Sequence, residues 1–282
     1  MRTNSIEMLT LYNRCFPHLQ TDELVFSERL LLEKGSIILE HREGGVLVGF
    51  SVVNDDAILL LCVDENHRRK GIGTHLLTIS EEHIKKDFHE IKLGISRNTY
   101  LLCGAPTNDF YDFQSFFQKH GYTEKWVCCD MVIDLNKYKH IPELDNKDNN
   151  IIIRRRRNDM EEIENCIKCG NLIDDGWGEI YRDSTELIVA EVQGNIIGAV
   201  SVDPSYCMFP VSLKDAGSFG CLGVLKEYRE HGIGMKLCQE ALLSLKNSGC
   251  QTCHIGYTWL DWWYRKLGAI TYAKYWIGSK KI

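Results

Sequence analysis

The sequence contains one strand–turn–helix pattern twice, and this duplication restricts the fold more than any other feature. Both copies read Arg-x-x-Gly-Ile-Gly, at residues 68–73 and again at 229–234. An apolar run of strand length precedes each copy, and a helical pattern follows it. The corresponding glycines are 161 residues apart. A repeat of this length predicts two copies of one domain rather than a solenoid.

The repeated turn is expected to bind an anion. Glycine lets the backbone approach a ligand closely and adopt dihedral angles that other residues avoid. The first N–H groups of a helix lack partners within the helix and lie at the positive end of its dipole, so a phosphate or pyrophosphate can satisfy them. Two other phosphate motifs are excluded. The P-loop sequence is absent, and a dinucleotide fingerprint needs a third glycine where this chain has Leu76 and Leu237.

A second match supports the duplication. The segment 116–122 corresponds to 263–269, which lies 147 positions later. This offset is 14 residues smaller than the offset at the glycine turns, because the first half has a longer loop around 101–109. The two halves therefore share their order of elements, and they differ mainly in one loop.

The polar segment 141–150 is interpreted as a linker between an N-terminal domain at 1–140 and a C-terminal domain at 151–282. Each domain is expected to follow the order hairpin, strand, turn, helix, strand, helix, strand. Thr21 is the expected N-cap of the second helix. The predicted helices are 5–16, 22–32, 75–88, 110–119, 160–169, 236–246 and 260–267. The predicted strands are 36–40, 46–53, 57–63, 91–95, 122–135, 151–157, 186–192, 196–202, 218–225, 253–258 and 269–277.

Composition disfavours several classes of partner. The net charge of −6 over 282 residues argues against nucleic acid and anionic membranes, and it favours a cationic small molecule or peptide. The four arginines at 154–157 are interpreted as a solvated strand end rather than a nucleic-acid site. No apolar signal segment is recognised at the start, and the longest apolar runs are too short to cross a bilayer, so a cytoplasmic location is expected.

The twelve cysteines are expected to be reduced and buried. Two CxxC pairs, at 166–169 and 250–253, could together offer four thiolates to zinc. The first pair falls within a predicted helix, and neither pair is followed by a glycine-rich knuckle. We therefore interpret both pairs as core residues and expect no metal.

With these features the chain resembles the tandem GNAT-type acyl-CoA N-acyltransferases, a superfamily that includes mycothiol synthase. The resemblance rests on the two Arg-x-x-Gly-x-Gly turns and on the aromatic–basic helices that end at Gly121 and Gly268, and it covers nearly the whole chain. It implies an α/β fold of two tandem domains. Each would have a mixed, largely antiparallel sheet, helices on both faces and a splayed pair of strands that binds acyl-CoA. The first half departs from the pattern because it begins with helices and lacks a strand equivalent to 151–155.

The resemblance also implies which residues bind acetyl-CoA. The turn amides would bind the pyrophosphate, and the strand before each turn would bind the pantetheine arm through its backbone. The first turn contains more positive charge than the second, in which a glutamate and a histidine replace an arginine and a lysine. The expected cofactor-binding residues are Val63, Arg68, Arg69, Lys70, Gly71, Ile72, Gly73 and Thr74, and Val224, Arg229, Glu230, His231, Gly232, Ile233, Gly234 and Met235.

In most members of this family the amine attacks the thioester directly, and a tyrosine on the helix after the splayed strand protonates the departing thiolate. The second half has Tyr264 at that place, so Tyr264 is the expected catalytic acid. The first half has Phe117, which cannot donate a proton. Tyr257 and Tyr111 are weaker candidates for the acid that protonates the thiolate.

The general base is not identified by any diagnostic spacing. Glu227, Asp203, Asp215 and His254 are candidates, and a water relay would need none of them. Cys221, on the splayed strand of the second half, could carry an acyl group as a nucleophile, but packing is the preferred interpretation.

The expected function is acetyl transfer from acetyl-CoA to a primary amine of a small molecule or peptide, with catalysis in residues 151–282. The first domain would bind CoA or shape the acceptor cleft between the domains. The alternative is a non-catalytic acyl-CoA-binding or scaffold protein. Two features are consistent with it, namely Phe117 in place of the acid and the absence of a recognised general base.

Overall fold

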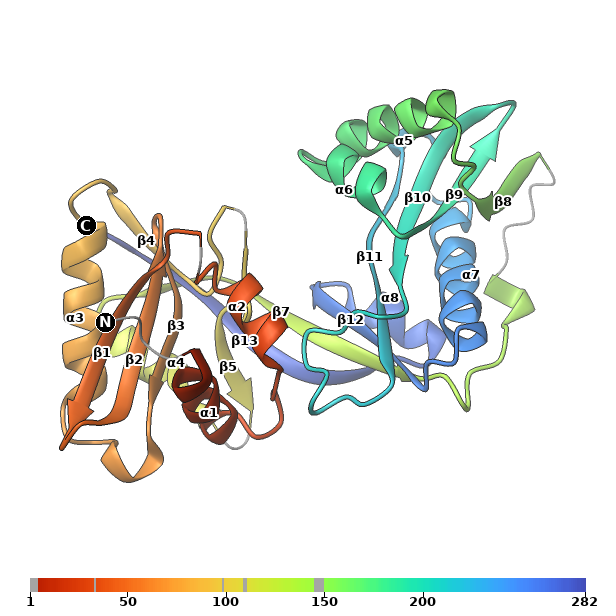
Figure 1. Cartoon of the computed structure of the whole chain (residues 1–282). Coiled ribbons are helices and arrows are strands. Elements are labelled where there is room, and N and C mark those ends of the chain that lie inside the picture. The colour runs from red at the N-terminus through yellow and green to blue at the C-terminus, as the bar shows by residue number, and fades with distance from the viewer. Residues whose placement is uncertain (1–4, 33, 98, 109–110, 145–149) are drawn as a thin grey trace.

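The computed structural model describes residues 5–32, 34–97, 99–108, 111–144 and 150–282. The chain forms two halves (Figure 1), which are connected by the long strands β7 (Thr123–Asp134) and β13 (Ile270–Lys281). Five residues of the predicted linker, 145–149, lie outside the described residues.

The first half has the expected order of elements. Its helices are α1 (Ser5–Cys15), α2 (Glu23–Arg29), α3 (Ile72–Ile84) and α4 (Phe113–Lys119). Its other strands are β1 (Ile37–Glu43), β2 (Val46–Asn54), β3 (Ala57–Val63), β4 (Glu90–Leu93), β5 (Ala105–Asn108) and β6 (Tyr111–Asp112).

The second half repeats this order. Its helices are α5 (Met160–Ile173), α6 (Trp177–Asp183), α7 (Ile233–Asn247) and α8 (Asp261–Tyr264). Its other strands are β8 (Ile151–Arg155), β9 (Glu186–Val192), β10 (Asn195–Asp203), β11 (Ala216–Val224) and β12 (Thr252–Thr258).

The strands form one continuous sheet in the order β1-β2-β3-β4-β13-β7-β12-β11-β10-β9-β8. Neighbours along this path pair antiparallel except at β3–β4 and β11–β12, which are parallel. The two parallel pairs occupy equivalent places, and a helix joins the two strands of each pair, α3 between β3 and β4 and α7 between β11 and β12. The mixed, largely antiparallel α/β architecture is confirmed.

The last strand of each half pairs beyond its own half. Strand β7 ends the first half but pairs with β12 of the second half, from Asp134 opposite Thr252 onward. Strand β13 ends the second half but pairs with β4 of the first, where Lys281 is opposite Glu90. The two strands also pair with each other over most of their length. The sequence showed no sign of this exchange, which joins the two predicted domains through backbone hydrogen bonds.

Helices cover both faces of the sheet in each half. In the first half, α1 and α2 pack on one face around Tyr12 and Phe26, and α3 and α4 pack on the other around Leu77 and Phe117. In the second half, α5 and α6 form a cluster around Tyr181 on one face, while α7 and α8 cover the other. Within the described part of the chain, none of the helices combines the length and the apolar character that a bilayer span requires.

Some local predictions were wrong in detail. Asp22, rather than Thr21, caps α2, because its side chain accepts the Val25 N–H at 2.9 Å. The Thr21 hydroxyl is fully buried and donates instead to the Met208 carbonyl of the second half, at 2.8 Å. The predicted loop before α4 contains β5, which pairs with β13, and helix α6 was not predicted.

Candidate active site

The first glycine turn begins where β3 ends. Arg69 and Gly71 both adopt left-handed dihedral angles, with φ of 62° and 87°, and α3 starts at the next residue, Ile72. A Cβ added at Gly71 would meet nothing within 4 Å, so the glycine is required by its φ rather than by crowding. The result is a turn whose amides precede an uncapped helix start, which is the arrangement that binds anions.

The second glycine turn repeats this geometry. Glu230 and Gly232 have φ of 71° and 77°, and α7 starts at Ile233. The motif arginines also match each other. Arg68 Nε donates to the Val63 carbonyl at 3.0 Å, and Arg229 Nε donates to the Val224 carbonyl at 2.9 Å. Each arginine therefore links the turn to the end of the preceding strand by a hydrogen bond. The sequence did not reveal this role.

The side chains of the predicted cofactor residues divide into two groups. The buried group can offer a ligand only its backbone, and it consists of Ile72, Val224, Ile233 and Met235. The others of the turns are at least partly exposed, and they include Arg69 and Lys70.

Each parallel strand pair separates before it reaches its turn. Strand β3 pairs with β4 only at Ala57 and Ile58, and then runs on to Val63. Strand β11 pairs with β12 only at its first three residues, 216–218, and then runs on to Val224. Both halves therefore contain the splayed strands that the resemblance implied, with unpaired strand edges leading to the glycine turn.

A pocket of about 550 Å³ lies at the splay of the first half. Its wall combines the outer part of β3, the first turn and α4, with Val63, Arg68, Arg69, Gly73 and Thr74 among the lining residues. Six of the eight predicted cofactor residues of this half, all except Lys70 and Ile72, thus line one cavity. Three cationic residues line the pocket, Arg68 and Arg69 of the turn and Lys119 of α4. Together with the amides of the helix start, they suit a phosphorylated ligand.

Phe117 also lines this pocket, at the place where the second half has Tyr264. Leu59 and Leu60 of β3 and Phe16 after α1 also line the pocket, and they belong to an apolar cluster that includes Tyr12 of α1. The first half therefore has a well-formed ligand pocket but only apolar side chains at the position of the proton donor.

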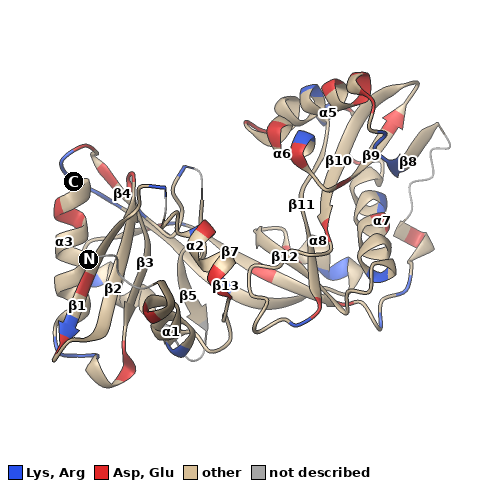
Figure 2. Ribbon diagram, viewed as in Figure 1, with Lys and Arg blue, Asp and Glu red and all other residues tan. Residues whose placement is uncertain are grey.

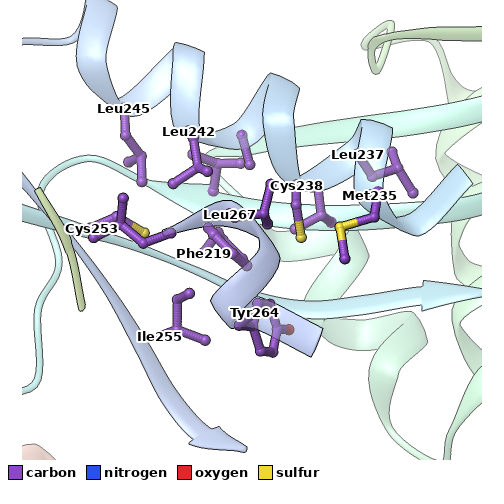
Figure 3. Close-up of a cluster of buried hydrophobic side chains, with 14 of the residues drawn as sticks. Phe219, Met235, Leu237, Cys238, Leu242, Leu245, Cys253, Ile255, Tyr264 and Leu267 are labelled. Atoms are coloured by element: carbon purple, nitrogen blue, oxygen red, sulfur yellow. The ribbon is translucent and has the colours of Figure 1, made fainter. Parts of the chain in front are cut away.

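Tyr264 of the second half lies beneath the splay of β11 and β12 (Figure 3). Its ring centroid is 6.1 Å from that of Phe219 on β11 and 4.9 Å from that of Trp263. Burial raises the pKa of the Tyr264 hydroxyl well above its usual value, and the nearby Cys238 and Cys253 thiols raise it further. The hydroxyl is therefore neutral at physiological pH and has a proton to donate.

Strand β11 is distorted at the splay. Cys221 has a φ of 48°, and the register with β10 shifts beside it, which marks a bulge. The Tyr181 hydroxyl donates to the Cys221 carbonyl at 2.7 Å, so α6 fixes the bulge from the far face. The pKa of the Cys221 thiol is raised to about 11 by burial, which argues against a nucleophilic role for this residue.

The candidate bases are not gathered at the splay. Asp215 precedes β11 and accepts a hydrogen bond from Gln251, and Asp203 is opposite Ser218, so both lie at the end of β11 away from the turn. Glu227 is exposed in the short turn before the second motif. His254 is buried, with Nε2 3.5 Å from Asp130 Oδ2. The side chain of Tyr111 lies outside the described residues.

Asp130 of β7 is a buried carboxylate that sequence reasoning missed. It accepts hydrogen bonds from the Tyr275 hydroxyl and the Tyr257 backbone N–H, both at 2.8 Å. It lies opposite a bulge at residues 256–257 of β12, and Tyr257 has a φ of 49°. Asp130 therefore fixes the part of β12 that diverges from β11. A charged residue within an apolar strand was the only available signal, and its partner became evident only from the exchange of strands.

The remaining sequence motifs have structural roles. Cys166 and Cys169 pack in the cluster under α5, whereas Cys250 and Cys253 pack under α7, so the two CxxC pairs do not converge. In the described ranges no group of three or more histidine, cysteine, aspartate or glutamate residues is placed to bind a metal ion.

Three of the four arginines in the run pair with carboxylates, and Arg156 donates to backbone carbonyls instead. Arg154 pairs with Glu162 and Glu191, and Arg157 also contacts Glu162. The Arg154 guanidinium holds the pKa of Glu162 at about 2. Figure 2 shows acidic and basic residues interspersed over both halves of the chain. The interpretation of the run as a strand end is supported.

The sequence matches the family model for the acetyltransferase (GNAT) domain over residues 33–124 and again over 183–268, which is more than half of the chain. The chain therefore belongs to the GNAT acetyltransferase family, with two such domains in tandem. A search of curated proteins found no match.

Solved structures of similar fold include tandem members of this family. One is a fungal multi-domain β-N-acetylglucosaminidase with a GCN5-related glucosamine N-acetyltransferase region, at TM-score 0.81 and 22% identity over 98% of this chain and 36% of that chain. This chain thus spans only about a third of that protein's length. Another is a GCN5-related N-acetyltransferase from Sphaerobacter thermophilus, at TM-score 0.77 and 15% identity, over 100% of this chain and 93% of that one. A third is a tandem GNAT protein from the clavulanic acid biosynthesis pathway, at TM-score 0.68 and 14% identity. That match covers 98% of this chain and 94% of the other.

Proposed function

We propose that the chain transfers an acetyl group from acetyl-CoA to a primary amine of a small molecule or peptide, with the chemistry in the second half. Membership of the GNAT family supports acetyl transfer in general. The observation that favours the second half is Tyr264, a buried and neutral hydroxyl beneath splayed strands that lead to a helix-start turn.

The protein must assist the proposed reaction in three ways. The amine must lose a proton, the tetrahedral oxyanion must be stabilised, and the departing CoA thiolate must gain a proton. Beyond residue 218, where β11 no longer pairs with β12, backbone N–H groups of β11 would bind the oxyanion. Tyr264 would protonate the thiolate, and water would remove the proton of the amine, because the candidate carboxylates are not gathered at the splay.

The first half is proposed to bind acetyl-CoA without catalysing transfer to an amine. Its pocket contains the cationic turn, but Phe117 takes the place of the acid, and apolar side chains such as Leu59 and Phe16 line the pocket. The same observations favour a second candidate function for the whole chain, namely an acyl-CoA-binding scaffold without turnover.

The two candidates are separated by incubating the full chain with acetyl-CoA and a panel of primary amines, and measuring released CoA by chromatography. The panel should include glucosamine, because one similar structure contains a region named for that activity. Amine-dependent release of CoA supports the acetyltransferase. Acetyl-CoA binding without release for any amine supports the scaffold.

A further inference from the structure

Two cysteines meet at the wall of the first-half pocket, and the proposed function uses neither of them. Cys15 ends α1, and Cys62 lies on β3. Both residues line the pocket. The Cys15 thiol donates to the Val63 carbonyl, with Sγ and the oxygen 3.5 Å apart, and Arg68 Nε donates to the same oxygen at 3.0 Å. A thiol and a guanidinium therefore converge at the end of the splayed strand.

The surroundings of Cys15 favour its thiolate. Its hydrogen bond with Cys62 lowers the pKa of the Cys15 thiol, and the Arg68 charge lowers it further, which together outweigh the effect of burial. Cys221, on the matching strand of the second half, has a pKa raised to about 11 by burial. Because the thiolate is the nucleophile in cysteine chemistry, the first half contains the more reactive thiol of the two.

We propose that Cys15 accepts the acyl group of acyl-CoA bound in the first-half pocket, so that this half becomes acylated on its own thiol. The inference rests on the proposed binding of acyl-CoA at this turn. Under that proposal the pantetheine arm lies along the end of β3, where Val63 contacts Cys15. Phe117 leaves this half without an acid for transfer to an amine, but transfer of the acyl group to a thiol needs no amine.

The step exchanges one thioester for another. The Cys15 thiol gives its proton to water, and its sulfur attacks the thioester carbonyl carbon. A carbon–sulfur bond to Cys15 forms, the carbon–sulfur bond to CoA breaks, and the CoA thiolate takes up a proton. No oxidant or reductant is required, and the products are S-acyl-Cys15 and free CoA.

The test uses the full chain, acetyl-CoA labelled in the acetyl group, and no amine. After an acid quench, intact mass and peptide mapping measure the label, and hydroxylamine sensitivity identifies a thioester. We expect one acetyl group on Cys15. The label should be lost in Cys15→Ala, lost in Gly73→Glu, which places a carboxylate in the pocket, and retained in the matched variant Cys221→Ala.

Titration of acetyl-CoA by calorimetry separates failure of this inference from failure of the proposed function. Acetyl-CoA binding without a label on Cys15, or a label that maps to another residue, overturns the inference and leaves the acetyltransferase proposal standing. A labelled Cys15 in a chain that acetylates no amine overturns the acetyltransferase proposal alone. Absence of acetyl-CoA binding overturns both.

Discussion

Replacing Tyr264 with phenylalanine removes the proposed acid and keeps the ring. The ring contacts Phe219 and Trp263, and phenylalanine can preserve both contacts. Loss of one general acid typically lowers a rate by about 10² to 10⁴, which corresponds to about 3–5 kcal/mol of transition-state stabilisation. The free energy of unfolding should change by less than about 1.5 kcal/mol, the usual contribution of one hydrogen bond.

The assay compares kcat, acetyl-CoA affinity by calorimetry and thermal unfolding in wild type and Tyr264→Phe. We expect a large fall in kcat, with affinity and unfolding nearly unchanged. The matched control is Phe117→Tyr, which adds a hydroxyl at the equivalent position of the first half and should leave kcat unchanged. Because burial raises the pKa of Tyr264, wild-type kcat should show no alkaline decline from this residue up to about pH 10, the usual pKa of tyrosine. A kcat in Tyr264→Phe equal to that of wild type would refute the assignment.

Two further predictions concern stability. Arg154 lowers the pKa of Glu162 to about 2 from an ordinary value of 4.5. The ionised Glu162 therefore contributes up to about 3 kcal/mol of stability above pH 4.5. This contribution is lost as the pH falls toward 2. Urea unfolding of Glu162→Gln should therefore show a deficit at pH 7 that shrinks at pH 3, and a deficit independent of pH would contradict this. Gly71→Ala should cost about 1–2 kcal/mol because φ is positive there. Gly73→Ala, whose Cβ would make an ordinary contact with Phe116, should lower the free energy of unfolding only slightly. If denaturant unfolding shows equal losses of stability for the two variants, the assigned turn geometry is contradicted.

The sequence was sufficient for features that are local along the chain. The two turns were predictable because left-handed glycines and a helix start lie within six residues, and the apolar runs before them form the splayed strands. The equivalence of Tyr264 and Phe117 followed from a short matched segment, and the structure places the two residues at equivalent positions on α8 and α4.

Features that depend on distant segments were not predictable. Each of β7 and β13 has a central run of buried residues that could pair within either half, so its partner cannot be read from its pattern. The role of Asp130 follows from that exchange. Thr21 lost its capping role because its hydroxyl bonds across to Met208, a contact that joins the two halves. The reactive setting of Cys15 similarly required the packing of α1 against β3.

The central claim is that acyl-CoA binds at the two glycine turns, and it is tested most directly by calorimetric titration of the full chain with acetyl-CoA. We predict two equivalents bound per chain. Gly73→Glu should remove one equivalent and spare amine acetylation, and Gly234→Glu should remove the other and abolish acetylation. A carboxylate at either helix start repels phosphate but favours the helix dipole, so both variants should remain folded. Binding that survives both substitutions, or acetylation that survives Gly234→Glu, would contradict the account.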